Sequence, residues 1–218
     1  MRHAPADLSP EQFRAIGHDL VDRVAEFLST LAERPVAPDS SPRATHAQLG
    51  TSDTVPARGE DPGAIARQAA RLLFDHSTFN GHPRFFGYIT SSASPIGALA
   101  DMLAASVNPN CGAWGLSPAA TEIERQTVRW IAQLIGYPSD TGGLLVSGGN
   151  MANMVCLMAA LRVQAAWDVR TLGVSASTPL RVYASSEVHT WLQKAADICG
   201  IGTGAVRSVP VDASLAMD

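Results

Sequence analysis

The chain has 218 residues, of which 46% are hydrophobic and 17% are charged, and its formal net charge is -4. These values are typical of a globular chain with a sizeable core, and they do not favour nucleic-acid binding. Three scattered cysteines indicate neither a disulfide framework nor a zinc site, and no apolar run is long enough to span a bilayer. We therefore expect a reduced, cytoplasmic protein that binds no metal, no nucleic acid and no membrane.

Helices dominate the prediction for the first half of the chain. Ser9-Pro10-Glu11 is a helix start, and apolar residues at helical spacing continue from it to Leu31. Residues 35–62, rich in proline and polar residues, predict an irregular connector. The glycine-bounded aromatic segment Gly81–Tyr88 is too punctuated for a helix, and it predicts either core packing or the wall of a pocket. We expect further helices over residues 63–76, 95–107 and 117–135.

Strands and helices alternate in the second half. Short apolar runs predict the strands, and amphipathic runs between them predict the helices. The order β-α-β-α-β predicts an α/β fold with a mostly parallel sheet. The expected elements are a strand at 144–146, a helix from Asn150 to about Trp167, a strand at 182–184, a helix over 187–198 and a strand at 206–211.

The turn Ser147-Gly148-Gly149-Asn150 connects the first expected strand to its helix. A helix start of this kind presents free backbone N–H groups and the positive end of the helix dipole, and glycines allow an anion to approach closely. Asn150 can cap the helix and donate from its amide. The alternative interpretation is a tight turn with an ordinary helix cap.

His189 follows the next strand and is predicted to lie just inside the start of a helix, where the dipole favours a neutral ring. A packing or capping role is the alternative. Lys194, the only lysine, is expected on a different face of that helix and therefore away from any ligand of His189. A Ser147–His189 hydrolase is disfavoured because Ser147 does not occupy the centre of a Gly-x-Ser-x-Gly elbow.

Five short stretches together resemble the pyridoxal 5′-phosphate (PLP) dependent group II amino-acid decarboxylases, the aromatic-L-amino-acid and glutamate decarboxylase group. They occur in that family's order and approximate spacing, over roughly residues 10–218, and the resemblance is to the N-terminal portion of these enzymes. The stretches are His82–Tyr88, Ala100–Leu103, Trp114–Glu124, Ser147–Asn153 and Ser185–His189.

The resemblance implies an aspartate-aminotransferase-like fold (fold type I) and a homodimer with its active site at the subunit interface. It implies that residues 1–94 form a helical dimerisation segment and residues 95–218 the first part of the large PLP-binding domain. Gly148, Gly149 and Asn150 then match the turn that holds the cofactor phosphate. The catalytic His189 matches the histidine that stacks on the pyridine ring.

Four residues match positions of the substrate pocket in this resemblance: Asn80, Tyr88, Ile89 and Trp114. Asn80 stands where aromatic-amino-acid decarboxylases tend to carry tryptophan, and Gly112 and Ala113 replace bulkier residues, which points away from an aromatic substrate. The family's Schiff-base lysine and pyridine-pairing aspartate are expected beyond Asp218, so this portion alone is expected to be inactive.

The implied reaction is decarboxylation of an L-amino acid to the amine and CO₂, and a histidine at the position of His189 favours this outcome over oxidative routes. Two alternatives stay open at this point. One keeps the fold and changes the outcome to aldehyde formation or transamination. The other is an inactive fragment that only dimerises.

Overall fold

The computed structural model describes residues 7–49 and 57–218. The chain divides into two compact units, Met1–Asn108 and Pro109–Asp218. The predicted division at 94/95 differs from this one, because the helix that begins at Pro95 belongs to the first compact unit. Dimerisation through residues 1–94 stays a prediction. No helix in the described residues is both long enough and apolar enough to cross a bilayer.

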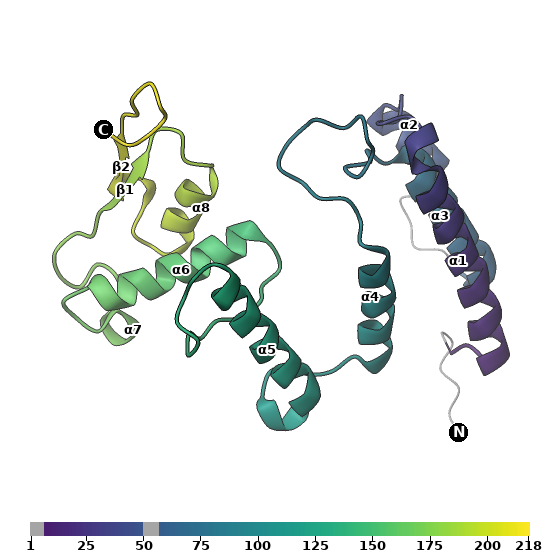
Figure 1. Cartoon of the computed structure of the whole chain (residues 1–218), viewed down its shortest axis with the longest axis horizontal. Helices are drawn as coiled ribbons and strands as arrows, with labels where there is room; N and C mark the ends of the chain where they lie inside the picture. Colours follow the sequence, from purple (N-terminus) through teal and green to yellow (C-terminus); the bar gives the residue numbers. More distant parts are fainter. Residues whose placement is uncertain (1–6, 50–56) are drawn as a thin grey trace. The chain divides into compact units, whose positions relative to one another are not determined.

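The first unit is built on α1 and α3, which pack side by side (Figure 1). Ser9 and Gln12 form a capping box at the start of α1, and the rings of Phe27 and Phe74 stack between the two helices at 4.4 Å. The helix starts predicted at Ser9-Pro10 and at residue 95 are confirmed. Both are marked by a serine cap followed by proline, a signal that depends only on neighbouring residues. The helices of this unit are α1 (Pro10–Thr30), η1 (Leu31–Glu33), α2 (Pro42–Gln48), α3 (Pro62–His76) and α4 (Pro95–Val107).

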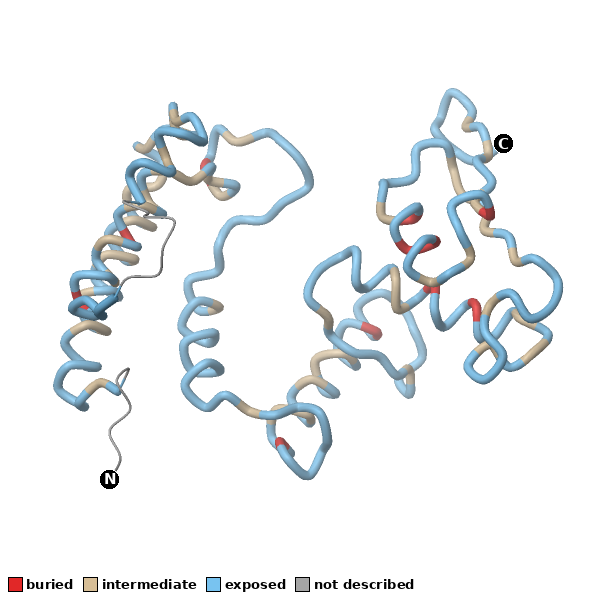
Figure 2. The backbone as a smooth tube through the Cα atoms, turned by 180° about the vertical axis from the view of Figure 1, so that it is seen from behind, coloured by how far each residue is buried: buried red, intermediate tan, exposed pale blue. Residues whose placement is uncertain are grey.

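The second unit contains a two-stranded parallel sheet, in which β1 pairs with β2 in the register Val182↔Val206 to Ser185↔Val209. Helix α6 packs against α8, and Leu157, Leu161 and Ala195 form the centre of their shared core. Figure 2 shows the buried residues of this unit gathered mainly along these helices. The elements are η2 (Trp114–Leu116), α5 (Pro118–Leu134), α6 (Gly149–Gln164), α7 (Val169–Leu172), β1 (Val182–Ser185), α8 (Trp191–Ile198), η3 (Thr203–Ala205) and β2 (Val206–Val209).

The predicted strand at 144–146 is wrong. Residues 141–146 are irregular, and Leu144 and Leu145 are more than half exposed. Leu145 N donates to the Glu124 carboxylate at 2.8 Å, so this backbone group pairs with a side chain of α5 and not with a neighbouring strand. A strand requires a ladder partner, and within the described residues β1 and β2 pair only with each other.

Three further predictions need correction. The connector over 35–62 contains a short helix, α2, whose N-cap Ser41 accepts from Ala44 N. The segment between α6 and β1, in which no helix was expected, contains the single turn α7, capped by Asp168. Helix α8 begins at Trp191 and not at residue 187, because residues 185–188 form a hydrogen-bonded turn first.

Candidate functional site

The start of α6 is the first part of the candidate site. Gly148 is its N-cap, with φ of 110° and ψ of 167°, a backbone conformation that glycine adopts at little cost. The first intrahelical bond runs from Ala152 N to Gly148 O, so the N–H groups of Gly149, Asn150 and Met151 have no partner within the helix. In the described part of the chain no side chain caps α6. These unshared donors and the helix dipole make this terminus attractive to an anion.

Asn150 does not cap α6, which corrects the prediction. It lies inside the first turn, because the helix already begins at Gly149. The side chain of Asn150 is exposed and its residue makes no hydrogen bond other than helical ones. A Cβ added at Gly148 or Gly149 would meet no heavy atom within 4 Å, so the backbone at this terminus is open to a ligand.

His189 lies in the turn between β1 and α8, and the prediction that places it inside the helix is wrong. Val188 N donates to Ser185 O, and His189 Nδ1 accepts from Trp191 N at 3.2 Å. Because an amide N–H can only donate, Nδ1 must carry the lone pair, and Nε2 then carries the proton of the neutral ring. The imidazole is exposed, and its bond to Trp191 N fixes its orientation at the start of α8.

A common core fixes the α6 terminus and the His189 turn within one unit. Val182 of β1 and Trp191 of α8 pack against the cluster centred on Leu157 and Leu161 of α6. Ser186 N also donates to Val209 O, which ties the end of β1 to β2. Among the described residues no hydrogen bond joins His189 to Ser147, so a hydrolytic pair gains no support.

Trp114, the fourth of the predicted pocket residues, also belongs to the second unit. Its indole Nε1 donates to Glu122 Oε1 at 2.8 Å, and Arg125 Nη1 donates to the same oxygen at 2.9 Å. The indole is therefore oriented by the first turns of α5. This role of Glu122 was not predicted from the sequence. The signal was available, because Glu122 follows Trp114 by eight residues and lies one helical turn before Arg125.

The other predicted pocket residues, Asn80, Tyr88 and Ile89, lie in the first unit on the segment between α3 and α4. Tyr88 and Ile89 are 92% and 106% exposed, and Tyr88 has φ of 60°, which is unusual for a residue with a large side chain. Phe86 is also exposed, so the core interpretation of Gly81–Tyr88 fails for these rings. The buried residue of this segment is His82, for which the sequence predicted no individual role.

Residues 44–218 match the pyridoxal-dependent decarboxylase conserved domain. The chain belongs to the pyridoxal-dependent decarboxylase family. It is 27% identical over 208 residues to an aromatic-L-amino-acid decarboxylase of Bacillus atrophaeus, with 95% of this chain and 41% of that protein covered. It is 32% identical over 208 residues to a phenylacetaldehyde synthase of Petunia hybrida, with 93% and 40% covered.

Among solved structures, mouse CSAD matches with a TM-score of 0.84 and 25% identity, over 97% of this chain and 44% of CSAD. The helices and small parallel sheet described above are thus part of the fold of the pyridoxal-dependent decarboxylases, which is fold type I. The chain spans about two fifths of the length of the curated relatives named here.

The cofactor of the pyridoxal-dependent decarboxylases is PLP, which carries a phosphate ester on a pyridine ring. The start of α6 fits the phosphate: it offers unshared N–H donors, the positive end of a helix dipole and a glycine backbone with open space around it. Lys194, the single lysine, is exposed on α8 and makes no hydrogen bond that would direct it toward α6.

Proposed function

We propose that the protein to which this chain belongs decarboxylates an L-amino acid to the amine and CO₂ with PLP as its cofactor. The observation that carries the proposal is the open, uncapped start of α6 in a chain that matches the pyridoxal-dependent decarboxylase domain. PLP supplies an electron sink that stabilises the charge left at the α-carbon when the carboxylate departs.

The start of α6 holds the cofactor phosphate in this proposal. The backbone N–H groups of Gly149 and Asn150 donate to the phosphate oxygens, and the Asn150 amide adds a further donor. Gly148 provides the backbone turn that aims these groups at one place. The dianionic phosphate is then held by neutral donors and a dipole, which fix the cofactor without bringing a competing charge near the reacting atoms.

His189 would stack on the pyridine ring of the cofactor and is proposed as the catalytic residue of this portion. Its Nδ1 is held by Trp191 N, so Nε2–H is the group that can donate to a substrate carboxylate or to a ring substituent. The short turn from Ser185 to Trp191 fixes the ring plane, because Val188 N and Glu187 N both donate to Ser185. A stacked and oriented imidazole restricts the substrate to one geometry and excludes water from one face.

The substrate pocket is proposed to comprise Asn80, Tyr88, Ile89 and Trp114. Trp114 is fixed by Glu122, and the exposed side chains of Tyr88 and Ile89 are free to contact a ligand or a partner chain. A homodimer with its active site at the interface suits the apolar side chains that α4 exposes. They are Ile96, Leu99, Met102, Leu103 and Val107.

Lys194 is not assigned the covalent role in this proposal. A lysine and a pyridine-pairing aspartate are expected from the remainder of a longer protein, since the chain covers about two fifths of its relatives. The 218-residue portion alone is then expected to be inactive. We also place the protein in the cytoplasm, where its free thiols at Cys111, Cys156 and Cys199 stay reduced.

Aldehyde formation is the second candidate, favoured by the 32% identity to a phenylacetaldehyde synthase. The two outcomes differ in products: the decarboxylase releases CO₂ and an amine, whereas the oxidative route consumes O₂ and water and releases CO₂, ammonia, hydrogen peroxide and an aldehyde. A histidine at position 189 favours the amine.

The test is a panel of L-amino acids with the full-length protein, in which CO₂, amine, aldehyde and O₂ are measured together. Equal amounts of CO₂ and amine without O₂ consumption support the proposal. Aldehyde with O₂ consumption supports the second candidate. A full-length protein that binds no PLP and has no lysine reducible by borohydride contradicts both, and would leave dimerisation as the function of the chain.

A further inference from the structure

His82 is the most buried titratable residue in the first unit, at 3% exposed. Both of its ring nitrogens are hydrogen bonded: Nε2 lies 3.0 Å from Arg34 O, and Nδ1 lies 3.0 Å from Arg84 N. A carbonyl oxygen only accepts and an amide N–H only donates, so Nε2 must carry the proton and Nδ1 the lone pair. The ring is therefore neutral with one tautomer, and both of its polar atoms are satisfied.

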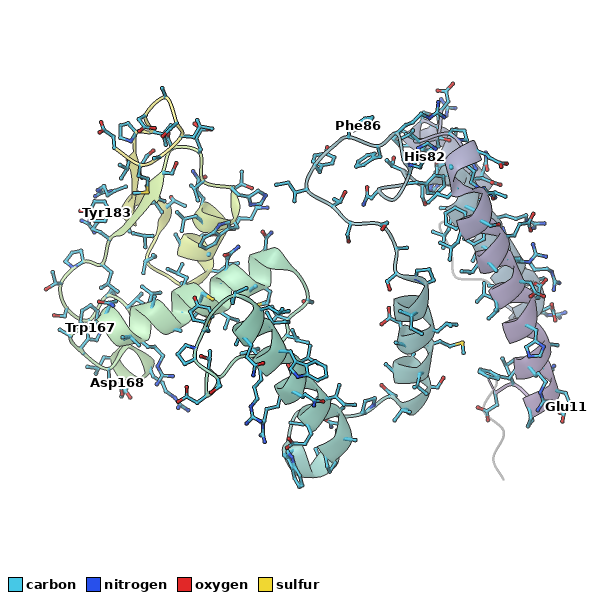
Figure 3. The ribbon with its side chains drawn as sticks, viewed as in Figure 1. Glu11, His82, Phe86, Trp167, Asp168 and Tyr183 are labelled. Atoms are coloured by element: carbon cyan, nitrogen blue, oxygen red, sulfur yellow. The ribbon has the colours of Figure 1, made fainter. Side chains whose placement is uncertain are left out.

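The bond from His82 to Arg34 O links segments 48 residues apart. Arg34 follows the end of α1, and its side chain is itself held: Nη1 donates to Phe74 O at 3.3 Å, and the guanidinium lies 5.1 Å from the Phe27 ring centroid. His82 thus attaches the segment after α3 to the packed pair of α1 and α3. Figure 3 shows His82 beside this helix pair, with Phe86 further out on the segment.

Residues 81–92 form a loop whose two ends meet. A Cβ added at Gly81 would lie 3.0 Å from Ser92 Cβ, so the chain returns to the place where it left. On the first side of this neck, His82 N donates to Phe79 O and Phe85 N donates to His82 O. Within the described residues no hydrogen bond is made by residues 86–93. His82 is therefore the last polar anchor before Tyr88.

We propose that His82 is a positioning residue for the substrate pocket: its bond to Arg34 O fixes loop 81–92, and through the loop it sets the place of Tyr88 and Ile89. The inference rests on the proposed function only in assigning Tyr88 and Ile89 to the pocket. A side chain that places a pocket wall affects binding of the substrate more than the chemical step, so its loss raises KM with little change in kcat.

Two substitutions separate the two bonds of the ring. In His82→Asn, the amide oxygen occupies the place of Nδ1 and can accept from Arg84 N, but the side chain is too short to reach Arg34 O. In His82→Gln, the amide nitrogen occupies the place of Nε2 and can donate to Arg34 O, while Arg84 N loses the acceptor that Nδ1 provides. His76→Ala is the matched control, because it breaks the bond between His76 Nδ1 and another distant residue, Ser40, and His76 holds no part of the loop.

In the full-length enzyme, His82→Asn should raise KM for the amino acid about tenfold while kcat and PLP affinity stay within about twofold. His82→Gln should return KM to within about threefold of wild type, and His76→Ala should leave KM unchanged. A wild-type KM in His82→Asn would overturn the proposal. The proposal would also be overturned if His82→Asn and His82→Gln lowered kcat, PLP binding or thermal stability to the same extent and left KM unchanged.

Trypsin cleavage after Arg84 gives a second measurement that does not depend on activity. Cleavage should be faster in folded His82→Asn than in wild type or His82→Gln. Equal cleavage rates would contradict the proposal that the bond from His82 to Arg34 O fixes loop 81–92.

If His82→Asn does not fold, Gly81→Ala replaces it. The added Cβ presses on Ser92 and displaces the two ends of the loop, while both hydrogen bonds of the His82 ring stay intact. An unchanged KM in Gly81→Ala would also overturn the inference. A wild-type protein that releases no CO₂ would refute the proposed function alone, and the cleavage rates would still report on His82.

Discussion

The carboxylate of Glu124 accepts a hydrogen bond from Leu145 N at 2.8 Å, and this bond joins α5 to the segment that leads into the Gly148 turn. The segment makes no ladder with another strand in the described residues, so the position of the turn depends on this side chain. In the proposed function the turn holds the cofactor phosphate. If that proposal holds, Glu124 would contribute to cofactor binding without contacting the cofactor.

Glu124→Ala is expected to weaken PLP binding about threefold to tenfold, because Leu145 N loses its acceptor and the approach to the turn loosens. Glu124→Gln keeps an oxygen at the same place and should bind PLP within about twofold of wild type. Titration of the full-length apoenzyme with PLP measures both. Equal affinities for Ala and wild type would show that the bond does not position the turn.

Gly148 and Gly149 are expected to respond differently to alanine. Gly148→Ala places a side chain at φ of 110°, which should lower the free energy of unfolding by about 1–3 kcal/mol. Gly149→Ala lies in helical backbone with open space around its Cβ, so stability should hold while PLP affinity falls as the phosphate is kept at a distance. Thermal unfolding of the apoenzyme and PLP titration separate the two effects. Unchanged PLP affinity in Gly149→Ala would argue against the phosphate assignment.

Asn150→Asp tests the same assignment by charge. The carboxylate stands in the first turn of α6, where it is compatible with the helix dipole but repels a phosphate. We expect the apoenzyme to be as stable as wild type, and PLP affinity to fall about tenfold or more. Asn150→Ala, which removes the amide without adding charge, is the control and should lose less. PLP binding as tight as wild type in the Asp variant would place the phosphate elsewhere.

His189→Ala should keep PLP bound and lower kcat about a hundredfold, because the imidazole is lost while the α6 terminus is intact. The variant also removes the acceptor for Trp191 N, which affects stability. His189→Asn restores an acceptor at the place of Nδ1 and should recover stability but not turnover. Single-turnover CO₂ release combined with thermal unfolding distinguishes the two roles. A His189→Asn enzyme with wild-type kcat would leave His189 only its role in the turn.

Cys199 is expected to react slowly with iodoacetamide. It packs against the α6–α8 core, and burial raises the pKa of its thiol, so less thiolate is present near neutral pH. Cys111 and Cys156 are exposed. Mass spectrometry of the labelled protein should show Cys199 modified last in the native state, and at a rate similar to the others in denaturant. Rapid native labelling of Cys199 would contradict its packing in this core.

The sequence predicted best those elements whose signals are local. The Ser9-Pro10 start, the helix over 95–107 and the strands at β1 and β2 follow from caps and apolar spacing within a few residues. The errors arose where a partner outside the segment decides. The sequence predicts a strand at Leu145, but its N–H donates to the Glu124 carboxylate. The sequence predicts a helix at His189, but its Nδ1 accepts from Trp191 N in a turn before the helix.

In the candidate site, too, local features could be predicted from the sequence and contacts between distant residues could not. The Gly148-Gly149 turn is visible in sequence because positive φ and an open helix start require glycine there. His82 could not have been assigned, because the residue that gives it a role, Arg34, contributes only its carbonyl oxygen. Every residue has a backbone carbonyl oxygen, so the sequence does not show which one accepts a hydrogen bond. Three-dimensional proximity was needed to find it.

The parallel pair of β1 and β2 has an unpaired edge on each side within the described residues. Such edges present rows of free N–H and C=O groups that can recruit any extended chain nearby. A protein that exposes these edges would therefore tend to self-associate through strand addition. Low protein concentration or a chaperone should limit this association when the chain is produced.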